Sequence, residues 1–255
     1  MIRLQHIHFM REQQHILDDV NLTMRPEENW VILGKNGSGK TTILELMCGY
    51  QFPSSGSVEV LGNRYGECDV REVRKSLGYI SQSLFEKFTA HDPVWEIVAT
   101  GEYAYLRIYQ KIPDDVITKA DRILATLRLA HLRNQPLGTL SQGERKKVML
   151  ARTLMANPRL IIMDEPCSGL DLYERENMLD SIAKLQNSGV QLVYVTHHIE
   201  EIIPLFTHVA LIEQGRVVAA GPKEETLTAE LLYRTFQVPV AVEWSNGRPW
   251  IKVQA

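Results

Sequence analysis

The stretch GKNGSGKTT, residues Gly34 to Thr42, contains the phosphate-binding pattern G-x-x-x-x-G-K-T. The apolar run WVILG precedes it and predicts a strand, and TTILELMCGY follows with apolar residues at helical spacing. Glycines allow backbone N–H groups to approach phosphate oxygens closely, and the start of a helix adds partial positive charge. This stretch therefore predicts a phosphate loop, with Lys40 against the β- and γ-phosphates and the Thr41 hydroxyl on magnesium. Its members are Gly34, Lys35, Asn36, Gly37, Ser38, Gly39, Lys40, Thr41 and Thr42.

Further strand-like runs alternate with helical patterns, and this alternation predicts an α/β fold with a parallel sheet. The runs are LIIMDE at 160–165, QLVYVTH at 191–197 and VALIEQG at 209–215. Residues between about 86 and 156 show helical spacing without a strong strand, which predicts a helical insertion. The final AVEWSNGRPWIKV predicts a hairpin around a Ser-Asn-Gly turn.

Polar side chains follow several of these strands, at the sheet edge where α/β proteins bind ligands. Asp164 and Glu165 end one strand, so one carboxylate is expected to hold magnesium through water and the other to orient the attacking water. His197 ends another strand and can report the γ-phosphate, although His198 beside it leaves the assignment open. Gln82 also follows a strand and is by itself an ordinary loop residue.

The stretch LSQGERKKVMLARTL at 140–154 permits two interpretations. Ser141 and Glu144 have the spacing of a capping box at the start of a helix. The remaining N–H groups there, with Gly143, can also meet a phosphate, and the residues alone do not separate the two. The basic residues Arg145 to Lys147 and Arg152 are interpreted as a solvated helix face.

Composition limits the classes of protein to consider. The chain has 255 residues and a formal net charge of −3, which predicts one two-lobed domain and no nucleic-acid partner. The three cysteines have no paired spacing, which fits a reduced cytoplasm. No apolar run approaches the roughly 18 residues of a membrane span, and the N-terminus lacks the apolar core of a signal peptide.

Taken together, these motifs resemble the ATP-binding cassette family over nearly residues 1 to 225. In order, they are the phosphate loop, Gln82, LSQGE, LIIMDEP, SGLD at Ser168 to Asp171, and VTH at 195–197. The chain resembles a single cassette of a bacterial ABC transporter. The resemblance implies a RecA-like P-loop core with a mainly parallel sheet, an antiparallel portion at the N-terminus and a helical subdomain inserted at about 86–156. Residues 226–255 are then expected to form a short C-terminal helix and hairpin extension.

The same resemblance implies an ATPase that uses ATP and Mg²⁺ and dimerises head to tail with itself or a homologous cassette. Each ATP would lie between the phosphate loop of one subunit and the signature loop of the other, defined as Ser141, Gln142 and Gly143. Asp171 would help to link the two sites. The implied catalytic residues are Glu165 as base, His197 as switch, Lys40, and Gln82 linking magnesium to the membrane partner. The implied metal-binding residues are Thr41, Gln82 and Asp164.

The expected partners are transmembrane permease subunits and, for an importer, a substrate-binding protein. This places the chain in the cytoplasm, peripheral on the inner face of the cell membrane. The alternative is a soluble cassette ATPase that couples ATP to nucleic-acid, ribosome or regulatory binding. Such proteins usually carry tandem cassettes, a long coiled-coil insertion or zinc cysteines, and the sequence has none of these. A GTPase is disfavoured because no Asn-Lys-x-Asp motif occurs.

The sequence departs from the family pattern at two places. The signature reads LSQGE where LSGGQ is commonest, and Ser141 and Gly143 are retained. Arg11 occupies the place after the first strand where cassettes usually have an aromatic residue that stacks on adenine. A guanidinium also stacks on a base, so Arg11 is the candidate adenine contact, ahead of Phe9.

Overall fold

A computed structural model describes residues 1–81 and 88–254 of the chain. The chain divides into two compact units, which are described separately. Unit 1 comprises Met1–Arg74 and Gln191–Ala255, and unit 2 comprises Lys75–Val190. None of the helices within the described ranges combines the length and the apolar composition that crossing a membrane requires.

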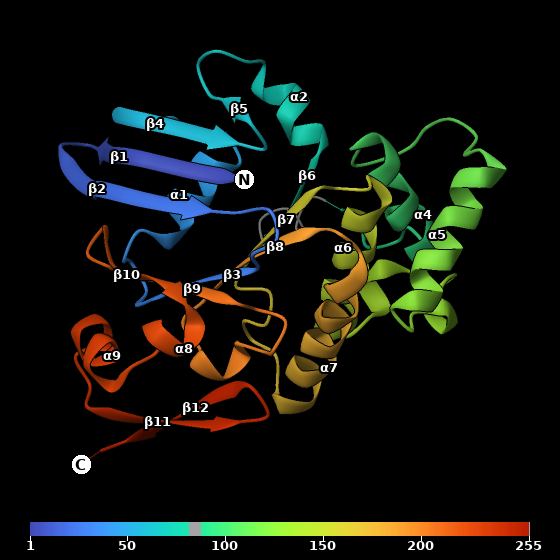
Figure 1. Ribbon diagram of the computed structural model, residues 1–255. Coiled ribbons are helices and arrows are strands. Elements are labelled where there is room, and N and C mark those ends of the chain that lie inside the picture. Colours follow the sequence, from blue (N-terminus) through green and yellow to red (C-terminus); the bar gives the residue numbers. More distant parts are fainter. Residues whose placement is uncertain (82–87, 255) are drawn as a thin grey trace. The chain divides into compact units, whose positions relative to one another are not determined.

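Unit 1 contains two groups of hydrogen-bonded strands, and helix α1 (Lys40–Met47) contacts both (Figure 1). The first group is antiparallel, with the order β2-β1-β4-β5, and confirms the antiparallel portion expected at the N-terminus. The second group has the order β10-β9-β3-β8. The strands are β1 (Ile2–Arg11), β2 (Gln14–Met24), β4 (Ser55–Val60), β5 (Asn63–Arg64), β3 (Trp30–Gly34), β8 (Gln191–Thr196), β9 (His208–Glu213) and β10 (Arg216–Pro222).

Strand β3 carries the phosphate loop and lies between two parallel neighbours, β8 and β9. All five of its residues are buried, which explains why its sequence is a continuous apolar run and not an alternating one. Leu33 pairs with Thr196 of β8 and with Leu211 of β9. The residues that follow β3 and β8, including the phosphate loop and His197, therefore leave the sheet at the same edge.

The remaining regular elements of unit 1 are short helices and the C-terminal hairpin. These helices are α2 (Val70–Lys75, ending at the boundary between the units), η5 (Ile199–Glu201), α8 (Lys223–Thr226) and α9 (Ala229–Phe236). The predicted hairpin is present as β11 (Val240–Ser245) and β12 (Arg248–Val253), paired antiparallel. Asn246 and Gly247 both have positive φ, at 50° and 72°, as expected for a two-residue turn that follows the strand twist.

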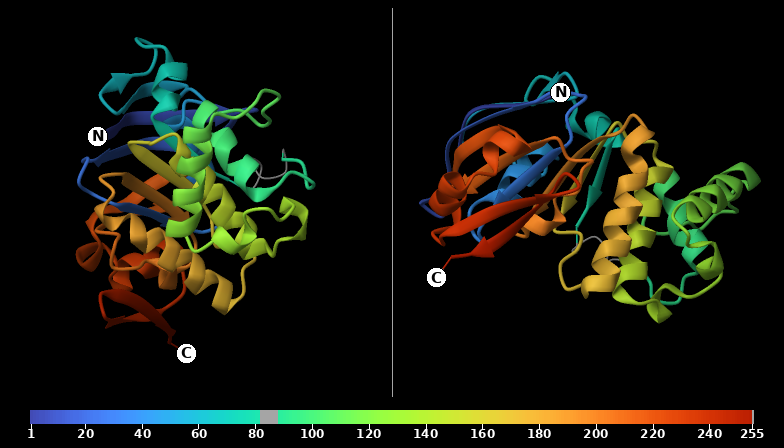
Figure 2. Two further views of the ribbon diagram at one scale, coloured as in Figure 1. Left: turned by 90° about the vertical axis from the view of Figure 1, so that its right-hand side faces the viewer. Right: turned by 60° about the horizontal axis from the view of Figure 1, so that its bottom comes forward.

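Unit 2 has one parallel pair of strands and a set of helices. The strands are β6 (Leu77–Ile80) and β7 (Leu160–Asp164). The helices are α4 (Val94–Ala99), η1 (Thr100–Tyr103), α5 (Asp114–Thr126), η2 (Ala130–Leu132), η3 (Leu137–Thr139), α6 (Gln142–Met155), α7 (Leu172–Ala183) and η4 (Lys184–Asn187). Helices α4, α5 and α6 contact one another. Helices α6 and α7 run side by side (Figure 2).

Arg152 of α6 corrects the interpretation of the basic residues as a solvated face, because its side chain is only 9% exposed. Its Nε donates to Thr100 Oγ1 at 3.0 Å and its Nη2 to the Tyr105 carbonyl at 2.8 Å. Burial lowers the pKa of Arg152 to about 10. The guanidinium thus fastens α6 to the segment after α4. That segment approaches closely, since a Cβ on Gly101 would lie 2.0 Å from the Arg152 carbonyl oxygen.

Candidate functional site

The phosphate loop joins β3 to α1 through a tight turn that requires glycine at two places. At Gly34, a Cβ would lie 2.3 Å from the carbonyl oxygen of Ile212. At Gly39, φ is +102° and a Cβ would lie 2.7 Å from Leu17 Cδ2. Gly39 is also the N-cap of α1 and offers no capping side chain, so the helix start is left to other acceptors. The loop therefore brings bare backbone to the positive end of a helix.

Lys40 places its ammonium group at this loop. The residue is 5% exposed, and Nζ donates to the carbonyls of Gly34 at 2.8 Å and Lys35 at 2.9 Å. A lysine is seldom buried to this degree without acceptors around its ammonium group. The two loop carbonyls hold the charge at the mouth of the turn, where an anion would bind.

The Ser38 hydroxyl provides a second indication that the loop accepts a ligand. Ser38 is 4% exposed, and its Oγ is buried with no hydrogen-bond partner among the described residues. Buried hydroxyls are normally satisfied, so such a group requires an explanation. A phosphate oxygen in the glycine cradle is an acceptor of the required kind. The residues present therefore fit the triphosphate that the sequence pattern predicts.

The two candidates for an adenine contact differ in accessibility. Phe9 is 6% exposed, whereas Arg11 at the end of β1 is exposed and its guanidinium lies 5.9 Å from the centre of the Phe9 ring. Burial disfavours Phe9 as a stacking surface, which leaves Arg11 as the candidate. The neighbouring strand β2 reaches the phosphate loop, because the Ile16 carbonyl oxygen would lie 3.2 Å from a Cβ on Gly39.

His197 follows β8 directly and is half-buried. The rings of His197 and His198 lie 4.1 Å apart, and His198 Nδ1 is 3.4 Å from Glu200 Oε1. The His198 ring is thus engaged by its own helical turn.

Glu201 stabilises the turn after β8, and the sequence alone did not indicate this residue. It is 2% exposed, and its Oε2 accepts from Tyr194 Oη at 2.8 Å and from Thr196 Oγ1 at 2.6 Å. Thr196 Oγ1 in turn accepts the backbone N–H of His198 at 3.0 Å. A buried carboxylate therefore fixes the backbone on both sides of His197. The only signal in the sequence was an acid four residues after His197, a spacing too common to be informative.

In unit 2, the acidic pair lies at the end of β7, where Asp164 is the last residue of the strand and Glu165 begins a strained turn. Ile80 pairs with Met163, so Ser81 and Asp164 lie at the same edge of the β6–β7 pair. Glu165 has φ of +46°, the left-handed region that side-chain-bearing residues seldom adopt. Its carbonyl accepts the N–H of Ser168 at 3.0 Å, which closes the turn. Such strain is commonly retained where a side chain must be aimed. Gln82 lies outside the described residues.

The signature loop starts α6, and the predicted capping box is confirmed. Ser141 Oγ accepts the Glu144 N–H at 3.2 Å, and Glu144 Oε2 accepts the Ser141 N–H at 2.8 Å. Ser141 and Gln142 are exposed and Gly143 is buried. The capping interpretation is therefore correct, and it leaves the exposed Ser141 hydroxyl able to contact a ligand.

The loop between β7 and α7 packs against the start of α6. Asp171 is the N-cap of α7, and its side chain accepts the Glu174 N–H at 2.8 Å. A Cβ on Gly169 would lie 3.2 Å from Gln142 Nε2, and Lys146 Nζ donates to the Ser168 carbonyl. The Asp171 segment and the signature loop are thus joined within one unit.

The structure places the candidate residues in two sets. The phosphate loop, Arg11 and His197 belong to unit 1, and the signature loop, Asp164, Glu165 and Asp171 belong to unit 2. Among the described residues, no group of three or more His, Cys, Asp or Glu side chains could hold a metal ion. Magnesium in nucleotide sites is bound by one or two protein oxygens together with phosphates, so such a cage is not required.

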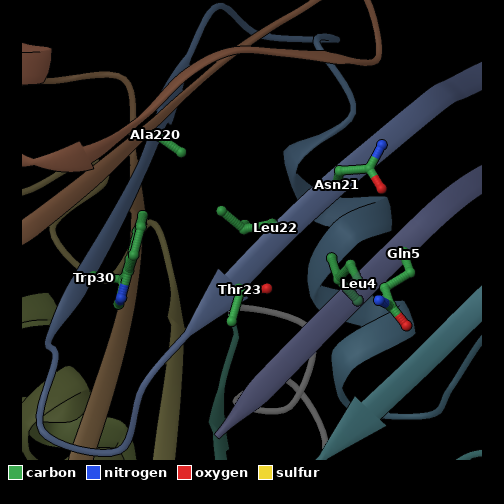
Figure 3. A pocket seen from close by; sticks show the side chains of 7 residues that line it. All are labelled: Leu4, Gln5, Asn21, Leu22, Thr23, Trp30 and Ala220. Carbon is green, nitrogen blue, oxygen red and sulfur yellow. The ribbon is translucent and has the colours of Figure 1, made fainter.

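A cavity of about 300 Å³ in unit 1 is distinct from the phosphate loop. It is lined by Leu4, Gln5, Asn21, Leu22, Thr23, Trp30 and Ala220 (Figure 3). Trp30 is the first residue of β3, whereas the loop follows Gly34 at the last. The cavity therefore opens at the other end of the strand.

Comparisons with known proteins indicate the family and the fold. The family described as ABC transporter matches residues 17–168. The chain is 37% identical, over 98% of its length and 96% of the relative's, to YlmA of Bacillus subtilis (strain 168), an uncharacterized ABC transporter ATP-binding protein. Cassette cbiO1 of Clostridium perfringens, part of the transporter complex cbiONQ, has a TM-score of 0.79 at 25% identity, covering 91% of this chain and 92% of cbiO1.

A further solved structure is the dimeric bacterial ABC transporter cassette MJ0796. Its TM-score is 0.75 at 24% identity, and the match covers 87% of this chain and 98% of MJ0796. These structural likenesses confirm the expected RecA-like fold.

Proposed function

The chain belongs to the ABC transporter family as an ATP-hydrolysing subunit, and on this premise we propose that it works as a head-to-tail dimer around two ATP. In this dimer the phosphate loop of one subunit and the signature loop of the other hold the same triphosphate. The observation that carries the nucleotide site of this proposal is the buried Lys40 ammonium in a glycine cradle at the carboxyl end of β3.

Each residue of the site performs a limited task. Lys40 and the loop N–H groups neutralise the phosphates, and Ser38 contributes its unsatisfied hydroxyl. Glu165, turned out of β7 by its left-handed backbone, accepts a proton from the attacking water. His197 donates to the γ-phosphate, and the Glu201 network holds its turn in place. Magnesium, held by Thr41 and Asp164, would neutralise charge that develops on the phosphates.

The signature loop is assigned to the partner's nucleotide because it presents a hydroxyl at the positive end of a long helix. Helix α6 has 14 residues, and Ser141 at its start is exposed. Its N-terminal dipole attracts anions. The dimeric form of MJ0796 supports an assembly of this kind.

Transmembrane subunits are the proposed partners, which places the chain on the inner face of the cell membrane. This proposal draws on cbiO1, which is part of a transporter complex. Affinity purification of the tagged chain from detergent-solubilised cells is expected to retain proteins with several membrane spans, absent from a tag-only control. Recovery of ribosomes or nucleic acid without such proteins would favour the soluble alternative.

Arg11→Ala is expected to weaken ATP and GTP binding by similar small factors, about two- to fivefold, because a stacked guanidinium contributes modestly at an exposed site. The phosphates would continue to supply most of the affinity. Equilibrium binding of both nucleotides measures the effect. Arg64→Ala is the matched control, since Arg64 is also exposed and its ion pair is with Glu67. A strong preference for ATP that survives Arg11→Ala would assign base recognition to another residue.

A further inference from the structure

We propose that Glu174 is a positioning residue of the signature loop, whose carboxylate opposes phosphate at Ser141 and so raises the ATP concentration needed to close the dimer. The inference rests on the proposed function, because it requires a phosphate to bind there. Glu174 was not among the residues that the sequence indicated.

The two oxygens of the Glu174 carboxylate both contact the signature loop. Oε1 lies 3.4 Å from Ser141 Oγ, within hydrogen-bonding distance. Oε2 lies so close to Gly143 that a Cβ there would be 2.0 Å away. The Glu174 backbone is fixed at the start of α7, since its N–H donates to Asp171 Oδ1 at 2.8 Å. The carboxylate thus occupies the surface of the loop that a ligand would approach.

The hydroxyl of Ser141 cannot serve both acceptors at once. It has one proton, and its oxygen already accepts the Glu144 N–H. In the described structure the remaining hydrogen bond joins it to Glu174. A γ-phosphate that accepts from Ser141 must therefore replace Glu174 as the acceptor.

The negative charge of Glu174 also opposes phosphate binding at Ser141. The Glu144 carboxylate already caps this helix end, and Glu174 adds a second negative group beside it. The nearby Lys146 ammonium donates to the Ser168 carbonyl, and Arg145 Nη2 donates to the Gly138 carbonyl. Both cations keep their charge, so the repulsion assigned here comes from the Glu174 carboxylate beside Ser141 Oγ, at a helix end whose dipole attracts phosphate. The site closes only when Glu174 turns away.

Glu174→Gln keeps the shape of the side chain and removes its charge. We expect the ATP concentration at half-maximal turnover to fall about three- to tenfold while kcat stays within twofold, because a single charge and hydrogen bond near a surface are worth roughly this much. The ATP-dependent dimer, measured by analytical ultracentrifugation in the Glu165→Gln background, should form at correspondingly lower ATP. Added salt should reduce the difference in half-saturating ATP concentration between Glu174→Gln and wild type, because salt screens the repulsion between Glu174 and phosphate.

Two further variants make the test decisive. Glu174→Ala should also lower the half-saturating ATP concentration. If that concentration falls in Glu174→Gln but not in Glu174→Ala, the introduced amide binds phosphate and the proposal is overturned. Asp180→Asn removes one charge from the same helix, where Asp180 pairs with Lys184 at 3.3 Å. This control variant should leave the half-saturating ATP concentration unchanged. Unchanged half-saturation in an active Glu174→Gln enzyme contradicts this inference alone. If wild type neither hydrolyses ATP nor dimerises, the proposed function fails, and this inference fails with it.

Discussion

Glu165→Gln is expected to lower ATP turnover by about 10²- to 10⁴-fold, the range that a general base contributes, while ATP binding is retained. The amide has the shape of the carboxylate but cannot accept a proton from water. Because binding persists without hydrolysis, dimers should accumulate with ATP. Turnover and size-exclusion mass with magnesium-ATP measure the two effects.

The backbone at Glu165 makes this prediction specific to one of the two adjacent acids. Glu165 has φ of +46° directly after β7, whereas Asp164 is still the last residue of the strand. The turn directs the two side chains differently, so substitutions of Asp164 and of Glu165 are expected to have different effects on turnover. Glu176→Gln on α7 is the control for loss of a carboxylate and should leave turnover near normal. Near-normal turnover in Glu165→Gln would contradict its role as the base.

Local features of this protein could be predicted from the sequence. The phosphate loop was identified because its glycines, lysine and flanking strand and helix are adjacent in the chain. The capping box at Ser141 depends on a three-residue spacing and was equally accessible. A parallel sheet was predicted from the alternation of strands and helices, since parallel strands need a crossover between them, and the pairing of β3 with β8 is parallel.

Features that depend on distant contacts could not be predicted. Arg152 was expected in solvent because arginine usually is, but it packs against Phe88 and donates to Thr100, 52 residues away. Glu174 meets Ser141 across 33 residues, and no local pattern marks that contact. Glu201 is a buried acid, and the hydrogen bonds that its carboxylate accepts from two hydroxyl groups offset the cost of burying it. The role of Gln82 stays a prediction.

The mixed dimer of Lys40→Ala and Ser141→Arg is expected to recover one working site. Each homodimer has two damaged sites, because every site contains either the missing ammonium or the bulky arginine. Both homodimers should be nearly inactive. In the mixed dimer the two lesions fall in the same site, and the other site combines an intact Lys40 with an intact Ser141.

The central claim is that phosphate loop and signature loop act across the dimer, and the most direct test is the amount of ATP trapped per mixed dimer. Glu165→Gln is added to both chains to stop turnover, and purified heterodimers are compared with each homodimer. The head-to-tail account predicts one trapped ATP for each heterodimer and almost none for either homodimer. If confirmed heterodimers trap no more ATP than the homodimers, the loops act within one subunit and the account is contradicted.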